Sequence, residues 1–164
     1  DFSSEESWLS ELSNYPNLIV LQTFSKAWGM ASVRCGMAFA SEEIIGYFNK
    51  VKYPYNINKL TQEFVLSRLQ NVELKEKQTK IILDERPKLV SELEKLSVVE
   101  KVYASDANFL LVRVDNAPKI YNELASRGIV VRSRHNIVLC NNCLRITIGT
   151  ADENKIIVET LKEL

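Results

Sequence analysis

One short stretch contains side chains that could do covalent chemistry, "TFSKAWGMASVRCG" at residues 23–36. Lys26 follows the hydroxyl residues Thr23 and Ser25, and Arg34 comes eight positions after the lysine. An amine of this kind can condense with a carbonyl group when its surroundings keep it neutral. Hydroxyl donors and the guanidinium fork of an arginine together suit a phosphate dianion. The stretch therefore combines groups for binding an aldehyde and a phosphate.

Pyridoxal phosphate is the cofactor that carries both of those groups. Gly29 and Gly36 would allow the backbone to approach it closely. We therefore predict that Lys26, in a partly buried pocket, forms a Schiff base with this cofactor. An exposed loop lysine with no chemical role is the alternative. A P-loop is not predicted, because the pattern G-x-x-x-x-G-K-[ST] is missing.

The composition is that of an ordinary globular protein. The 164 residues are 46% hydrophobic and 26% charged, and 21 Lys+Arg balance 21 Asp+Glu. A formal net charge of zero argues against nucleic acid or an anionic membrane as the main partner. No apolar run reaches the roughly 18 residues of a membrane span, and Asp1 opens a polar segment rather than a signal peptide.

The three cysteines indicate a reducing cytoplasm and no disulfide framework. Cys140 and Cys143 form a C-x-x-C pair, with His135 five residues before it. Zinc sites normally use four ligands, often as two such pairs. We therefore predict no metal site and interpret the pair as loop cysteines.

The first part of the chain predicts strands and helices in alternation. An apolar strand at 18–22, of the type buried on both faces of a parallel sheet, precedes the lysine stretch. A strand at 34–40 and a helix capped by Ser41 follow it. The turn-rich "YPYNIN" at 53–58 leads to helices at 58–70 and 72–96. Pro87 should kink or restart the last helix, which makes 83–88 a candidate hinge.

The second part predicts a small α+β unit. Strands are expected at 99–103, 108–114, 129–133, 137–140 and 143–149. A helix from Ala117 to Gly128 has Asn116 as its cap, and a capping box from Thr150 to Glu153 opens the last helix. The fold class is therefore α/β, with residues 1–84 in the tail of a larger parallel-sheet domain and 85–164 in a small C-terminal α+β domain.

The lysine stretch closely resembles the lysine segment of fold-type I aminotransferases, roughly T-x-S-K-x-x-x-(L/M)-A-G-x-R-x-G. Ser32 stands where that family usually has glycine. The resemblance implies that Lys26 binds pyridoxal phosphate covalently and later moves a proton between substrate and cofactor. It implies that Ser25 and Arg34, and more weakly Thr23, hold the phosphate.

Further motifs are similar to those of histidinol-phosphate aminotransferases. They are "YPYNIN", "ANFLLV", "GIVVRS" and "CLRITIGT". The resemblance implies that Arg145 and Arg132 bind the anionic end of the substrate, and that Tyr55, Asn56 and Asn108 line the pocket. Each role has a structural alternative. Arg145 could be a strand arginine paired with a carboxylate, and Arg134 could compete with Arg132 for its role. Tyr55 and Asn56 could simply cap a helix, and Asn108 could bond the backbone.

The resemblance implies a cytoplasmic homodimer that moves an amino group between histidinol phosphate and 2-oxoglutarate or glutamate. It covers about the C-terminal half of such an enzyme. The glycine-rich turn, the stacking aromatic ring and the aspartate that family members place earlier are missing from the chain, so we expect these 164 residues alone to be catalytically incomplete. Other aminotransferases, including those of aromatic amino acids, threonine-phosphate decarboxylases and a non-catalytic folding or dimerisation unit remain alternatives.

Overall fold

The chain forms two compact units. The computed structural model describes all of residues 1–164. The first unit contains Asp1 and Ser3–Gln78, and the second contains Phe2 and Thr79–Leu164. The division between Gln78 and Thr79 falls six residues before the boundary expected at 84/85 and outside the candidate hinge at 83–88. It lies within one helix, α3 (Val72–Leu93).

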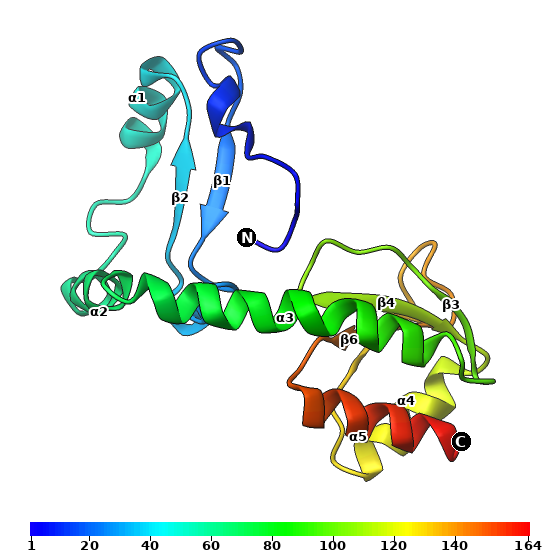
Figure 1. Cartoon of the computed structure of the whole chain (residues 1–164). Helices are drawn as coiled ribbons and strands as arrows, with labels where there is room; N and C mark the ends of the chain where they lie inside the picture. Colours follow the sequence, from blue (N-terminus) through cyan, green and yellow to red (C-terminus); the bar gives the residue numbers. More distant parts are fainter. The chain divides into compact units, whose positions relative to one another are not determined.

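The first unit is built around a two-stranded sheet. Strands β1 (Val20–Thr23) and β2 (Gly36–Phe39) lie side by side in Figure 1 and pair antiparallel, with Thr23 opposite Gly36. Its helical elements are two short 3₁₀ helices, two α-helices and the start of α3, namely η1 (Trp8–Glu11), η2 (Ala31–Val33), α1 (Glu42–Val51) and α2 (Lys59–Leu69).

The first strand differs from its prediction in its burial. A strand covered on both faces was expected at 18–22, but Ile19 and Leu21 are exposed, Leu21 by 74%. The reason is that β1 has a single neighbouring strand, β2, in a sheet of two. A strand becomes fully buried only when strands flank it and other layers cover both of its faces. The expectation of a buried strand is therefore wrong for this chain.

Helix α3 contains Pro87 without being restarted by it, one of the two effects that were predicted for this residue. The helix runs without interruption from Val72 to Leu93. Pro87 has no N–H to donate to the carbonyl of Leu83. Both residues are exposed, so water can satisfy this carbonyl, while Leu89 and Leu93 anchor the helix in the core.

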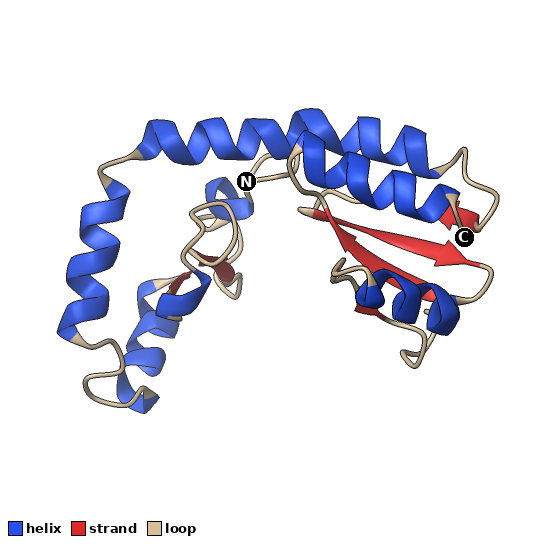
Figure 2. Cartoon of the chain, turned by 90° about the horizontal axis from the view of Figure 1, so that it is seen from below, coloured by secondary structure: helices blue, strands red, loops and turns tan.

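The second unit is an antiparallel sheet covered by helices. Its strands are β3 (Val99–Val102), β4 (Phe109–Val114), β5 (Arg132–Ser133) and β6 (Cys143–Thr147), in the order β3-β4-β6-β5. Leu110, Val112 and Val114 are buried, whereas the alternate residues of β4 are half-buried. One face of the sheet thus packs into a core with α3, α4 (Ala117–Ser126) and α5 (Ala151–Lys162). Figure 2 shows the end of α3 running alongside α5.

Local capping signals predicted the helix starts of this unit well. The Asn116 side chain accepts from the N–H of Lys119, and Thr150 and Glu153 form the expected reciprocal capping box. These predictions are confirmed, as expected for signals confined to four consecutive residues.

The strand predicted at 137–140 is wrong. These residues form successive turns, closed by hydrogen bonds from Ile137 N to Arg134 O and from Cys140 N to Ile137 O, each 2.9 Å long. Leu139 is left-handed, with φ 68°, which a strand does not allow. The apolar run "IVL" misled the prediction, because its side chains are exposed rather than packed. The preceding strand is also shorter than predicted, with β5 limited to Arg132 and Ser133.

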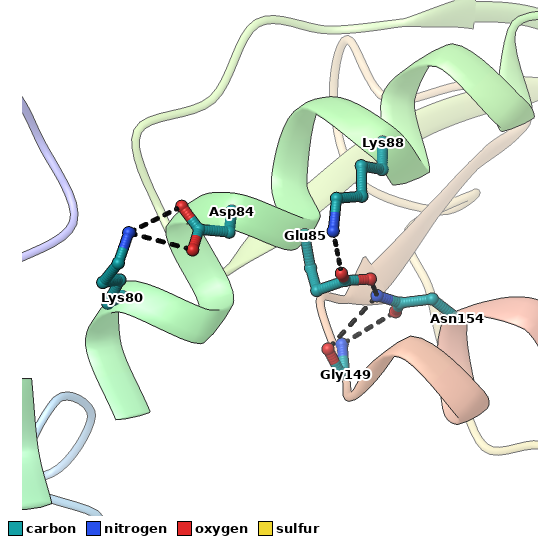
Figure 3. A network of polar contacts seen from close by, with 6 residues as sticks. All are labelled: Lys80, Asp84, Glu85, Lys88, Gly149 and Asn154. Carbon is teal, nitrogen blue, oxygen red and sulfur yellow. Dashed lines mark hydrogen bonds and ion pairs between the residues drawn. The ribbon is translucent and has the colours of Figure 1, made fainter. Parts of the chain in front are cut away.

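A buried polar network joins α3 to the start of α5. Glu85 is 9% exposed, and one of its carboxylate oxygens accepts from Asn154 Nδ2 at 3.1 Å and the other from Lys88 Nζ at 2.7 Å. Asn154 Oδ1 also accepts from the N–H of Gly149 at 2.9 Å, and Asn154 Nδ2 donates to the carbonyl of Gly149 at 3.2 Å (Figure 3). The hydrogen bonds from Lys88 and Asn154 lower the pKa of Glu85. The network fixes the turn between β6 and α5.

Replacing Asn154 with alanine is therefore expected to destabilise the second unit. The substitution removes three hydrogen bonds and leaves buried polar groups unpaired, which costs about 2–4 kcal/mol. Urea unfolding followed by circular dichroism measures this loss. Asn122→Ala, on the exposed face of α4, is the matched control and should change the free energy of unfolding by less than about 0.5 kcal/mol. Equal effects of the two substitutions would contradict the structural role of the network.

Candidate functional site

The pairing of β1 with β2 brings the predicted cofactor residues to one end of the hairpin. Beyond the Thr23–Gly36 pair, Phe24 N donates to Cys35 O at 3.3 Å. Met30 N donates to Phe24 O at 3.0 Å, which folds the intervening residues into a compact loop. We call residues 24–35 the lysine loop. It places Ser25 and Lys26 at the start and Arg34 at the end of one short segment.

The lysine loop leaves its reactive side chains available. The apolar residues Ala27 and Met30 are its buried members, whereas Lys26 is exposed and its amine makes no hydrogen bond or ion pair. The expectation of a partly buried Lys26 is wrong in this chain, because the loop turns Ala27 rather than the lysine inward. Thr23 Oγ1 accepts from Ser25 N at 3.2 Å, so this hydroxyl oxygen is already engaged with the loop backbone.

Arg34 has an unusual backbone conformation. Its φ is 52°, in the left-handed region that residues other than glycine and asparagine rarely adopt. One guanidinium nitrogen donates to Ala31 O at 3.0 Å, and the remaining N–H groups are free. Retaining an arginine at a strained position is typical of a functional constraint.

The groups of this loop fit pyridoxal phosphate. A free amine suits the aldehyde, and a hydroxyl with free guanidinium N–H groups suits the phosphate. Gly29 has φ +64° and open space around it, since no atom lies within 4 Å of a Cβ added there. The donor set and the open backbone are therefore compatible with a phosphate held at this end of the hairpin.

Tyr55 and Asn56 lie in the turn before α2. Tyr55 is 96% exposed and left-handed, with φ 58°. Asn56 is also exposed, and it does not cap the helix, because Asn58 Oδ1 accepts from Thr61 N at 2.9 Å and performs that role. The capping explanation for Asn56 is thus removed, while its role in a pocket stays a prediction.

The second unit brings the two predicted substrate arginines together. Arg132 and Arg145 are directly opposite each other on β5 and β6, and Arg145 also pairs with Leu111 of β4. The face that they share is opposite the core, because Leu144 and Ile146, the neighbours of Arg145, are buried. The guanidinium of Arg145 lies 4.8 Å from the centre of the Phe109 ring, and this cation–π contact orients it.

Arg145 is positioned without a counter-charge. Its Nε is buried and has no hydrogen-bond partner. Burial first, and then the positive charges of Arg134 and Arg132, lower the pKa of its guanidinium. No carboxylate is among the groups that shift it, so the alternative of a cross-strand salt bridge is not seen. Repelling cations and an unpaired donor favour an anion as the missing partner.

Asn108 precedes β4 and is half-buried. Its backbone carbonyl accepts from Ile148 N at 3.0 Å, beside the last residues of β6. Its side chain makes no hydrogen bond and is free to bind a ligand. The structure thus contains a lysine-loop cluster in the first unit and an arginine cluster in the second.

Sequence reasoning treated Arg134 as a competitor of Arg132 and missed Phe109 as the ring beneath Arg145. Arg134 is adjacent to β5, and its N–H donates to Cys143 O at 2.9 Å, which continues the pairing with β6. The spacing of Arg132 and Arg134 by two residues was the available signal, since it places both on one face of a strand. Phe109 and Arg145 are 36 residues apart, so no local pattern relates them.

The chain belongs to the aminotransferase class I and II family, because residues 1–161 match the sequence model of that family. It is 52% identical over 163 residues to the histidinol-phosphate aminotransferase of Bacteroides thetaiotaomicron, and 54% identical over 164 residues to that of Parabacteroides distasonis. The matches cover 99% and 100% of this chain but 47% and 48% of those proteins. The chain therefore spans about half the length of these curated relatives.

Solved structures agree with this assignment. The histidinol-phosphate aminotransferase of Clostridium acetobutylicum superposes with a TM-score of 0.87 at 27% identity, over 96% of this chain and 48% of that one. The fold class predicted from the sequence, part of a fold-type I aminotransferase, is thus confirmed. The enzyme from Sinorhizobium meliloti, solved with pyridoxal-5'-phosphate, has the same fold at 23% identity, with a TM-score of 0.79 over 94% of this chain and 43% of that one.

Proposed function

We propose that this chain provides part of the active site of a pyridoxal-phosphate-dependent transaminase that acts on histidinol phosphate, with 2-oxoglutarate and glutamate as the second substrate pair. The observation that supports it most is the match of essentially the whole chain to histidinol-phosphate aminotransferases at about 50% identity. The free amine of Lys26 and the unpaired guanidinium of Arg145 supply the chemical groups that such a reaction requires.

The proposal gives each cluster a chemical task. When bound, pyridoxal phosphate supplies the electron sink that allows a proton to leave the substrate carbon. Lys26 anchors the aldehyde and then carries that proton on Nζ. Ser25 and Arg34, with Thr23 in support, hold the phosphate. Arg145 and Arg132 bind the anionic end of the substrate, and Asn108, Tyr55 and Asn56 line the pocket.

The setting that we propose is a cytoplasmic homodimer. Three free cysteines are compatible with a reducing compartment. The exposed apolar residues of the first unit, among them Leu21 and Leu60, support burial against further protein. None of the helices combines the length and the apolar character needed to cross a membrane.

A substrate panel tests the proposal. In a hybrid enzyme, residues 1–164 replace the matching half of the Bacteroides thetaiotaomicron relative, to which they are 52% identical. We expect its kcat/KM for histidinol phosphate to exceed that for phenylalanine or tyrosine by at least about 100-fold, because paired arginines favour a phosphate dianion. The unaltered relative is the control. Preference for an aromatic amino acid, or decarboxylation of threonine phosphate, would contradict the substrate assignment.

A further inference from the structure

The arginine cluster of the second unit has a third member. Arg134 follows β5 directly, and the bond from its N–H to Cys143 O extends the ladder in which Arg132 already opposes Arg145. Residues two positions apart on a strand point to the same side. Arg132, Arg134 and Arg145 therefore present their side chains on the face of the sheet opposite the core.

All three arginines lack an acidic partner. The ion pairs of the second unit involve other cations, such as Arg127 with Glu123 and Glu163. Arg134 and Arg132 are both positive neighbours that, after burial, lower the pKa of the Arg145 guanidinium. Three clustered cations without an anion are destabilising in a folded protein. Such an arrangement is typical of a site completed by a ligand of high negative charge.

We propose that Arg134 is the third cation of this anion site and determines its preference for dianionic phosphate monoesters over carboxylates. The inference rests on the proposed function, since it refines how the same site chooses its substrate. Two arginines suffice to bind a carboxylate, which has one negative charge and two acceptor oxygens. A phosphate monoester has two charges and three acceptor oxygens, so it uses a third guanidinium that a carboxylate cannot engage fully.

The expected effect follows from the charge of the ligand. The Coulomb energy between Arg134 and a bound anion is proportional to the anion's charge. Removing the cation raises the Kd of a monoanion by some factor. It should raise the Kd of a dianion by about the square of that factor. A loss of about threefold for acetate thus corresponds to about tenfold for phosphate.

The test uses the 164-residue chain itself. Inorganic phosphate and acetate are titrated separately at pH 8 and constant ionic strength, while NMR follows the Nε–H signal of Arg145. We expect Arg134→Gln to raise the Kd for phosphate about tenfold and that for acetate about threefold. Arg134→Lys, which keeps the charge, should retain most of the preference for phosphate. The Arg134 side chain makes no hydrogen bond or ion pair, so these substitutions should not unfold the unit.

Arg113→Gln is the matched control, because it removes an arginine from the same sheet face. Arg113 lies over the Tyr103 ring at 5.7 Å and is not among the charges that act on Arg145. It should change neither affinity by more than about twofold. An unchanged preference in Arg134→Gln would overturn the inference, as would an unmodified chain that binds no phosphate. Neither result would alter the outcome of the substrate panel in the hybrid enzyme, so the two proposals fail separately.

Discussion

Replacing Lys26 with alanine is expected to reduce transamination by the hybrid enzyme at least about 10⁴-fold. The substitution removes both the amine that anchors the cofactor and the base that moves the substrate proton, and proton transfer alone is worth about 10²–10⁴-fold. In the structure the amine is exposed and engaged by no other group, so it is accessible to a cofactor. The measurements are kcat with histidinol phosphate and the visible absorbance after addition of pyridoxal phosphate.

The control for this prediction is Lys59→Ala in the same unit. The Lys59 side chain is 87% exposed and faces Glu63 at 3.7 Å, an exposed pair worth less than about 1 kcal/mol. It should leave both the rate and the absorbance unchanged. Retention of more than a tenth of the activity in Lys26→Ala would show that another group performs the proton transfer.

Replacing Arg145 with glutamine should reduce kcat/KM for histidinol phosphate about 100-fold or more. A buried charge-assisted contact to a ligand is worth about 2–5 kcal/mol when one partner is removed. Arg145 is held for such a contact by the Phe109 ring, and its guanidinium has no competing carboxylate. Arg145→Lys keeps the charge but loses the planar fork, so its loss should be intermediate.

Separate measurement of KM and kcat in Arg145→Gln distinguishes a loss of substrate binding from a loss of structure. A binding role predicts that Arg145→Gln raises KM strongly, while the visible absorbance of the bound cofactor is preserved. Arg113→Gln, on the same face but stacked on Tyr103, should leave kcat/KM within about twofold. If Arg145→Gln abolishes cofactor binding and leaves the substrate KM unchanged, the assignment of Arg145 to the substrate is contradicted.

Much of the fold was predictable because its signals are local. Asn116 and Thr150 mark helix starts through bonds to residues three positions away, and both predictions are confirmed. The absence of a strand at 137–140 was not predictable, because an apolar run in the sequence does not reveal whether anything covers it. A restart of the helix at Pro87 was wrongly allowed for a similar reason, since the effect of a proline depends on whether the freed carbonyl is exposed to water.

The residues of the candidate site were likewise predictable only where a local motif contains them. Lys26 and Arg34 are eight residues apart, and a motif reveals them together. The environment of Arg145 depends on Phe109 and Arg134, which three separate segments bring together, so only the folded sheet shows it. Glu85 and Asn154 are 69 positions apart, and nothing in the sequence around either residue predicts that they bond.

The most direct measurement is the position of covalent attachment. The hybrid enzyme is incubated with pyridoxal phosphate and reduced with borohydride, and the modified peptides are identified by mass spectrometry. Our account predicts that the label lies on Lys26, with less than about a tenth of it on other lysines, and that it disappears in Lys26→Ala. An active hybrid enzyme labelled mainly at another lysine would contradict the central claim that Lys26 is the cofactor-binding residue.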